Sequence, residues 1–367
     1  MGRKHGPVPF PRRGTVASND FIEKDFRQEL ARTGIHMSKK YKVVITDFIT
    51  EPLEPENQIL GDLSDVIALD GSREQDLAGK IEDADAIMLY HILGLTHKTI
   101  EQLNRCKLIV RCGVGYDNID HALARRRGIP VANVPDYGTE EVADSAIGLM
   151  MAMIRGITRI NSLLREAIGP WMYTQVVPLH RLRGRVFGIV GLGRIGTAAA
   201  LRAKALGMDV VFYDPYKPCG YEKAVGVRRV EHVDELFAQS HVLSLHCPLT
   251  EETFHLIDRR TIATLPAGAY LINTARGAVV DATSLPEALA SGQLAGAGID
   301  VLEQEPPPAD HPLIVAWRDP NHAAHHRLII NPHLAFYSEE GLMDMRTKGS
   351  IACRKALCGQ PIPNVVN

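Results

Sequence analysis

Short apolar runs alternate with helical stretches along most of the chain. The runs of a first series are bounded by polar turns and cover residues 43–46, 66–69, 86–90, 108–110 and 131–133. Helical stretches lie between them, and alternation of this kind indicates a parallel sheet covered by helices on both faces. A second series follows at 186–190, 210–213, 242–245, 269–273, 298–301 and 328–330. The pattern predicts an α/β protein with two doubly wound parallel sheets.

Two long helices help to place the domain boundaries. Residues 140–157 are rich in Ala, Met and Ile, and apolar positions continue around much of the predicted helix. This indicates burial, either inside the protein or against a second subunit. Another helix is predicted over 338–358, before Pro361 and Pro363. We predict a first domain of residues 41–141 plus 335–367 and a second domain of residues 142–334.

Residues 1–40 differ from the rest of the chain. The first sixteen residues hold basic side chains and prolines but no acidic residue, and they lack the apolar segment of a secretory signal. We expect a disordered extension, with an amphipathic targeting arm as the alternative. Met37 directly precedes the first predicted strand and is an alternative start of the protein.

Charge and cysteine usage exclude several function classes. The net charge is −2, with 41 basic and 43 acidic residues, which argues against a general nucleic-acid-binding surface. The longest apolar window, 146–154, is too short to span a bilayer. Six cysteines without C-x-x-C spacing indicate reduced thiols in a cytoplasmic protein. A solvated loop explains the histidines at positions 311–326 better than a metal site does. We therefore expect no metal, no nucleic acid and no membrane partner.

A glycine motif with the spacing G-x-G-x-x-G follows the run 186–190 and precedes a predicted helix. Gly191 permits a tight turn, Gly193 lets the backbone approach a pyrophosphate, and Gly196 lets the helix pack closely on the strand. Asp214 ends the next run, where a carboxylate can accept hydrogen bonds from both ribose hydroxyls of NAD and repel the 2′-phosphate of NADP. The motif predicts a Rossmann-like site that binds NAD.

Three side chains with useful chemistry follow the last strands of the second series. Arg276, Glu305 and His333 each come shortly after one of the last three runs. Ligands bind outside the carboxyl ends of such strands, so we expect these side chains to converge. A guanidinium binds a carboxylate through a planar fork, and an imidazole beside a carboxylate can give or take an alcohol proton. The set suits hydride transfer at a 2-oxo acid. Glu303 is the alternative carboxylate.

With these motifs in this order, the chain resembles the NAD-dependent D-2-hydroxyacid dehydrogenase family over about residues 41–366. The resemblance also rests on the segments 111–120, 140–144, 246–250, 273–277 and 332–333. It implies two Rossmann-like domains with the cofactor and the active site in the cleft between them. The implied reaction is the reduction of a small 2-oxo acid by NADH to the D-2-hydroxy acid, or the reverse.

The resemblance assigns roles to individual residues. Arg276 matches the substrate-orienting arginine, His333 the catalytic histidine, and Glu305 the glutamate that pairs with it. The expected cofactor contacts are Gly191, Gly193, Arg194, Ile195, Gly196, Asp214, His246, Pro248, Thr250, Thr274, Ala275, Arg276, Asp300 and His333. The expected substrate contacts are Tyr90, Arg111, Gly113, Val114, Gly115, Arg276 and Phe336.

For some of these residues the resemblance also implies which part of the ligand they contact. The backbone of residues 113–115 is expected to present N–H groups to the substrate carboxylate, because glycines allow close approach. Asp300 is expected to approach the nicotinamide carboxamide. For Tyr90, His91 and Arg111, ordinary packing or solvation is an equally good interpretation.

Within the family, the chain is similar to the branch that contains the C-terminal-binding proteins, through residues 202–205, 212–216 and 337–339. That branch has tryptophan where Phe336 stands and alanine where Leu334 stands, so the floor of the substrate pocket differs. Its members bind NAD(H) and act as transcriptional co-regulators, which makes an NAD(H)-sensing scaffold with weak dehydrogenase activity the alternative function. The resemblance also implies a homodimer, and Trp171 is interpreted as a core or subunit-interface aromatic.

Overall fold

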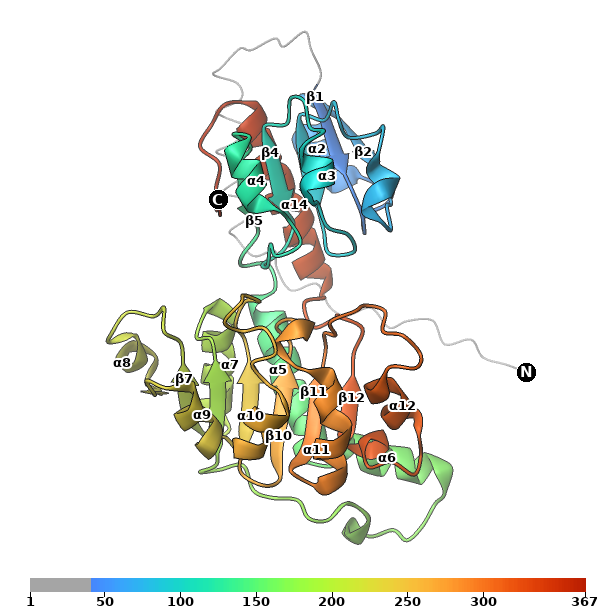
Figure 1. Ribbon diagram of the computed structural model, residues 1–367, viewed down its shortest axis with the longest axis vertical. Coiled ribbons are helices and arrows are strands. Elements are labelled where there is room, and N and C mark those ends of the chain that lie inside the picture. The colour runs from blue at the N-terminus through green and yellow to red at the C-terminus, as the bar shows by residue number, and fades with distance from the viewer. Residues whose placement is uncertain (1–40) are drawn as a thin grey trace, which may run out of the picture. The chain divides into compact units, whose positions relative to one another are not determined.

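The computed structural model describes residues 41–367. The predictions for residues 1–40, including an extension and a start at Met37, lie outside the described residues. The strands of the described part form two parallel sheets, and helices connect successive strands in each (Figure 1). This is the predicted Rossmann-like α/β fold.

The first sheet has the strand order β2-β1-β3-β4-β5. Its strands are β1 (Tyr41–Ile45), β2 (Ser64–Ala68), β3 (Ala86–Leu89), β4 (Leu108–Arg111) and β5 (Val131–Asn133). Their connections contain α2 (Glu54–Leu60), the 3₁₀ turn η1 (Glu74–Leu77), α3 (His97–Ile100) and α4 (His121–Arg126). Every residue of β3 and β4 is buried, as expected for strands with helices on both faces.

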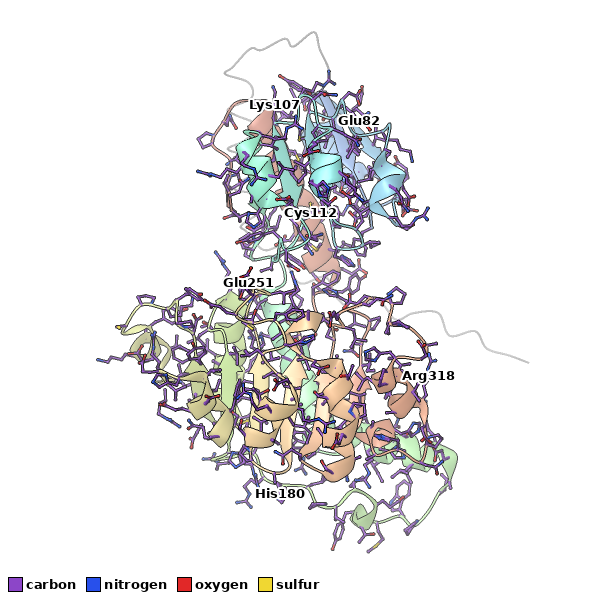
Figure 2. All side chains as sticks on the ribbon, viewed as in Figure 1. Glu82, Lys107, Cys112, His180, Glu251 and Arg318 are labelled. Carbon is purple, nitrogen blue, oxygen red and sulfur yellow. The ribbon has the colours of Figure 1, made fainter. Side chains whose placement is uncertain are left out.

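Helix α14 (Glu339–Leu357) comes from the C-terminal end of the chain but packs against α2, β3 and β4 (Figure 1). Its Gly349 makes this close packing possible, because a Cβ atom there would lie 2.6 Å from Cys112 Sγ. Figure 2 labels Cys112, which directly follows β4. The C-terminal segment is thus part of the core around the first sheet.

The second sheet has the strand order β12-β11-β10-β9-β6-β7-β8. Its strands are β6 (Val186–Val190), β7 (Asp209–Tyr213), β8 (Arg228–Arg229), β9 (Val242–Leu245), β10 (Ala269–Asn273), β11 (Leu294–Ile299) and β12 (Leu328–Ile330). Its helices are α7 (Arg194–Ala205), α8 (Tyr221–Val225), α9 (Val233–Gln239), α10 (Arg259–Thr264), α11 (Leu285–Ser291), α12 (Pro312–Arg318) and α13 (Ala324–Arg327), with the 3₁₀ turns η3 (Gly277–Val279) and η4 (Ala282–Ser284).

The chain leaves β6 towards β7 on one side and returns to β9 on the other. A reversal of this kind opens a crevice at the carboxyl ends of the two central strands, which is where open α/β sheets bind ligands. The first residues beyond these strands are Gly191 and His246. The sheet topology therefore places the glycine motif at the crevice.

The long helix predicted over 140–157 is two helices. Helix α5 (Thr139–Ile154) and helix α6 (Ile157–Glu166) meet at a bend of 56°. The break lies at Gly156, whose φ of +64° is a left-handed conformation that glycine adopts without strain. The two helices differ in burial, since α5 carries seven buried residues and α6 carries none.

Strand β11 begins four residues before the predicted strand 298–301. Its first half contains Gly296. Because glycine is depleted in strands, residue preferences did not predict this part of the strand. The structure shows why glycine is needed, because a Cβ atom on Gly298 would lie 3.0 Å from Leu149 Cβ of α5. The strand is built for close approach by α5.

Within residues 41–367, no single helix has both the length and the apolar character needed to cross a membrane. Helices α5 and α6 satisfy these two criteria only when they are counted together across their bend.

Candidate active site

The glycine motif forms a tight turn between β6 and α7. Gly191 has a φ of +88°, and a Cβ atom there would lie 2.8 Å from the carbonyl oxygen of His246. A Cβ atom on Gly196 would collide with the carbonyl of Gly191. A Cβ atom on Gly193 would meet nothing within 4 Å, so this face of the turn is open. The three glycines thus differ in surroundings as the motif requires: tight turn, open approach and close helix packing.

Asp214 lies directly after β7, beside this turn. Its Oδ2 accepts a hydrogen bond of 2.8 Å from the N–H of Leu192, and its Oδ1 accepts one of 3.0 Å from the N–H of Tyr216. These two bonds hold the carboxylate at the carboxyl end of the sheet.

A cavity of about 520 Å³ contains most of the residues expected at the site. Those that line it are Arg111, Val114, Gly115, Gly193, Arg194, Ile195, His246, Pro248, Thr250, Thr274, Ala275, Arg276, Asp300, His333 and Phe336. Sequence reasoning gave no site role to the further lining residues Tyr116, Asp117, His121, Asn133, Pro135, Tyr137, Val142, Cys247, Leu249 and Ala335. Many of these follow β4 and β5, and the rule that ligands gather at carboxyl strand ends could have pointed to them.

His333 and Glu305 form a hydrogen-bonded pair at this cavity. The distance from His333 Nδ1 to Glu305 Oε2 is 2.7 Å, and Glu305 Oε1 accepts a bond of 2.8 Å from the N–H of Leu302. Burial by itself would raise the pKa of Glu305, but the hydrogen bond and charge of His333 outweigh burial, so the pKa is lowered. Glu305 is therefore an ionised carboxylate at neutral pH.

The alternative carboxylate, Glu303, has a different partner. Its Oε2 lies 3.1 Å from Nε2 of His255, and it makes no bond to His333. Glu305 is the carboxylate beside His333.

Asp300 braces the turn that carries His333. Its carboxylate accepts hydrogen bonds of 3.0 and 3.1 Å from the N–H groups of Leu334 and Ala335. Its carbonyl accepts a bond of 2.8 Å from the N–H of His333. His333 adopts a φ of +53°, which is uncommon for a residue with a side chain and requires such support. The carboxylate expected to contact the nicotinamide is thus used on the protein's own backbone.

Arg276 is held by Asp117. The Nε atom donates a hydrogen bond of 2.8 Å to Asp117 Oδ1, and Nη1 donates one of 2.9 Å to the carbonyl of Ala275. Burial would raise the pKa of Asp117, but the charge and hydrogen bond of Arg276 outweigh it and lower the pKa. The remaining guanidinium nitrogen, Nη2, lies beside Gly115.

Arg111 lies deeper in the same wall. Its side chain is 6% exposed, and Nη1 donates a bond of 3.2 Å to the carbonyl of Cys112. Its Nε is buried without a hydrogen-bond partner. Burial and then the charge of Arg276 lower the pKa of Arg111. A cation in this situation is poised for an anionic ligand.

Gly113, a predicted substrate contact, is not among the residues that line the cavity. Its N–H donates a hydrogen bond of 2.8 Å to the carbonyl of Arg111, so it has no free donor for a substrate. In the described part of the chain, the N–H groups of Val114 and Gly115 make no such bond to the protein.

Tyr90 is the residue for which substrate contact and ordinary packing were equally good interpretations. Its side chain is fully buried in the core of the first sheet and does not line the cavity. The next residue, His91, has its ring centroid 5.4 Å from that of His333 and 5.4 Å from that of Phe336. Burial first, and then the charge of His333, lower the pKa of His91 to about 4, so its ring is neutral at pH 7.

The backbone behind His91 is fixed by Asp47. The carboxylate accepts hydrogen bonds of 2.9 Å from the N–H of Tyr90 and 2.8 Å from the N–H of Ile92. The next side chain, Phe48, has its ring 4.4 Å from that of His91. Sequence reasoning did not find Asp47 or Phe48, although both follow β1 at a strand end.

Unpaired polar atoms at the cavity fit a bound dinucleotide. Thr274 Oγ1 and His246 Nδ1 are buried without hydrogen-bond partners, and both residues line the cavity together with Gly193 of the glycine turn. The open face at Gly193 and the N-terminus of α7 suit a pyrophosphate. Among residues 41–367, no group of three His, Cys, Asp or Glu side chains could hold a metal ion.

Comparisons with known proteins agree with this arrangement. Residues 147–335 match the family model described as D-isomer specific 2-hydroxyacid dehydrogenase, NAD binding domain. The crystal structure of D-lactate dehydrogenase from Aquifex aeolicus, complexed with NAD and lactic acid, is similar with a TM-score of 0.77 and 28% identity, covering 86% of this chain and 96% of that one.

Two relatives are similar in sequence. A glyoxylate reductase of Korarchaeum cryptofilum is 37% identical over 294 residues, which cover 78% of this chain and 84% of that protein. A D-3-phosphoglycerate dehydrogenase of Methanocaldococcus jannaschii is 36% identical over 320 residues, which cover 87% of this chain but only 59% of that protein. The family model and the D-lactate dehydrogenase complex indicate NAD as the cofactor. The chain belongs to the family of NAD-binding, D-isomer specific 2-hydroxyacid dehydrogenases.

Proposed function

We propose that this protein reduces a small 2-oxo acid with NADH to the D-2-hydroxy acid, or catalyses the reverse reaction. The observation that carries the proposal is the pair of His333 and Glu305 at the same cavity as Arg276. The names of two similar proteins, glyoxylate reductase and D-lactate dehydrogenase, belong to this reaction class.

The cofactor would be held along the carboxyl edge of the second sheet. The turn from Gly191 to Gly196, with Arg194 and Ile195, receives the pyrophosphate, and Asp214 receives the ribose hydroxyls. His246, Pro248 and Thr250 would lie along the adenosine half, and Thr274 and Ala275 along the nicotinamide half. Bound NADH supplies the hydride for C2 of the substrate.

The substrate carboxylate would be held by Arg276 together with the N–H groups of Val114 and Gly115. The bond from Nε to Asp117 fixes the plane of the guanidinium, so that its far end faces the cavity. This orientation leaves the 2-oxo group beside His333.

His333 would act as the general acid of the reduction. Its Nδ1 is bonded to Glu305, so the other ring nitrogen, Nε2, is the atom that gives a proton to the developing alkoxide. The carboxylate of Glu305 stabilises the imidazolium and keeps the ring in one orientation. In the reverse direction the neutral ring accepts the alcohol proton.

The domain limits form part of the proposal: residues 41–141 plus 335–367 bind the substrate, and residues 142–334 bind NAD. The packing of α14 on the first sheet and the span of the family match support these limits. Closure of the two domains on the ligands would exclude water.

A homodimer is proposed through α6 and the loop after it. None of the residues of α6 is buried, and Ile168, Trp171 and Tyr173 are 83%, 78% and 75% exposed. Trp171 is thus not a core residue. An apolar surface of this kind commonly marks a protein interface. Sedimentation would test it, because Trp171→Asp should yield a monomer if this surface pairs two copies.

A cytoplasmic location goes with this proposal. All six cysteines are free, as is usual in reducing compartments.

A kinetic screen tests the proposed function. The purified protein would be given NADH with glyoxylate, hydroxypyruvate, pyruvate and 2-oxo-4-methylthiobutyrate in turn. Turnover near or above about 1 s⁻¹ with one of them is the expected result. Feeble turnover with all four, together with NADH-dependent assembly, would instead favour a scaffold like the C-terminal-binding proteins.

A further inference from the structure

The two glycines of the loop after β4 are docking positions for two arginines. A Cβ atom on Gly113 would collide with Nη1 of Arg111, and one on Gly115 would collide with Nη2 of Arg276. The glycines therefore make room for protein side chains rather than only for a ligand. Because they are two residues apart in one loop, they bring both guanidinium groups to the same wall of the cavity.

The charges on this wall do not balance. Asp117 is the carboxylate paired with Arg276. Arg111 is buried, and no carboxylate among residues 41–367 forms an ion pair with it. Two cations and one anion leave one positive charge, and burying such a charge without a partner is costly. One carboxylate of a bound ligand would therefore neutralise the charge of this wall.

Apart from the carboxylates of Glu305 and Asp300, the side chains beside His333 are apolar or neutral at neutral pH. Phe336, Ala335 and Val142 are apolar lining residues. Burial raises the pKa of Tyr137 above its usual value, and His91 is a neutral ring. A second carboxylate or a phosphate on the substrate would lose its hydration against these side chains without gaining a cation.

We propose that Arg111 and Arg276 bind one carboxylate between them, and that the site selects 2-oxo acids with a single negative charge and an uncharged substituent at C3. The inference rests on the proposed function and narrows its substrate class. It would set this chain apart from a relative named for a phosphorylated acid, the D-3-phosphoglycerate dehydrogenase.

Matched substrate pairs test this selectivity on the whole protein. 2-Oxopentanoate and 2-oxoglutarate have the same chain length but differ in a terminal methyl or carboxylate, and hydroxypyruvate differs from 3-phosphohydroxypyruvate by the phosphate. We expect kcat/KM to be about tenfold or more higher for the single-charged member of each pair. Equal values, or a preference for the doubly charged members, would overturn the inference.

Two variants distinguish the binding of one carboxylate by Arg111 and Arg276 together from the binding of a second anion by Arg111. Arg111→Gln should raise KM for 2-oxopentanoate about tenfold or more, since a hydrogen bond to a charged group is lost, while NADH affinity stays within about twofold. If Arg111 instead receives a second anion, the variant would harm only 2-oxoglutarate, and the inference would fail. Gly113→Ala displaces the guanidinium but keeps its charge, and should raise KM for 2-oxopentanoate in the same direction.

Controls distinguish a specific effect of Arg111 from a general loss of charge or of folding. Arg125→Gln removes an exposed arginine of α4 and should leave every KM unchanged. NADH titration of each variant reports whether it is folded, and Gly113→Ala tests the binding of one carboxylate by both arginines if Arg111→Gln does not fold. Absence of turnover with every 2-oxo acid in the wild type would overturn the proposed function itself, whereas turnover with the opposite charge preference would overturn only this inference.

Discussion

Glu305 and His333 are 28 residues apart in the chain, yet their side chains share a hydrogen bond of 2.7 Å. Each follows a strand of the second sheet, β11 or β12, and these strands are neighbours. The pair is further constrained at both ends, because Glu305 binds the N–H of Leu302 and the backbone of His333 is bound to Asp300. The imidazole is thus oriented before any ligand arrives, which is the condition for efficient proton transfer.

Replacement of His333 should abolish proton transfer but spare cofactor binding. His333→Ala is expected to reduce kcat by about two to four orders of magnitude, the usual contribution of a general acid. NADH affinity, measured by fluorescence titration, should change little because the glycine turn is untouched. Turnover like that of the wild type would remove His333 from the mechanism.

The two neighbouring glutamates provide a matched comparison. Glu305→Gln keeps the size of the side chain but removes the charge that stabilises the imidazolium, so kcat should fall about tenfold or more. Glu303→Gln removes the same charge from a residue bonded to His255, and its kcat should match the wild type. Equal losses in both variants would contradict the role given to Glu305.

Asp214 should determine the choice of cofactor. Its carboxylate would repel the 2′-phosphate of NADPH, so the wild type should prefer NADH in kcat/KM. Asp214→Ser removes this repulsion and should shift the ratio towards NADPH about tenfold or more, which steady-state kinetics with both cofactors would measure. If the wild type uses both cofactors equally well, Asp214 does not select between them.

His91 should make the protein less stable in mild acid. The pKa of its partly buried ring is about 4, against an ordinary value of 6.5. Between these pH values the unfolded chain binds a proton that the folded protein excludes, so the free energy of unfolding decreases as the pH falls from about 6.5 to 4. The upper limit of this loss is about 3 kcal/mol.

Urea unfolding at pH 7.5 and pH 5 would measure this loss. His91→Phe has no proton to bind and should lose less stability between the two pH values than the wild type does. An identical pH dependence in both proteins would show that His91 is not buried in its neutral form.

Much of the fold follows from local patterns. The strands 131–133, 242–245, 269–273 and 328–330 have the predicted limits, since each is a short, mainly apolar run between polar turns. The order of the strands, and the break at Gly156, depend on which surfaces pack together. A single glycine can continue or end a helix, so the sequence did not predict the break; in the structure Gly156 has a left-handed φ and lies where a Cβ atom would be 3.2 Å from Val176.

The candidate site divides in a similar way. Arg276, Glu305 and His333 could be predicted because each carries distinctive chemistry at a strand end. The supporting contacts were not found, because Asp117 and Asp47 act through partners 159 and 43 residues away, respectively. The burial of Tyr90 and the backbone hydrogen bond of Gly113 could not be predicted either, because a motif shows neither the burial of a side chain nor the partner of a backbone N–H.

The most direct test of the central claim is the product formed from NADH and a 2-oxo acid. Wild-type protein should oxidise NADH when given 2-oxo-4-methylthiobutyrate or pyruvate, and chiral chromatography should identify the D-2-hydroxy acid. His333→Ala should form this product at least about a hundredfold more slowly under the same conditions. Failure to bind NADH, or formation of the L-hydroxy acid, would contradict the account of this site.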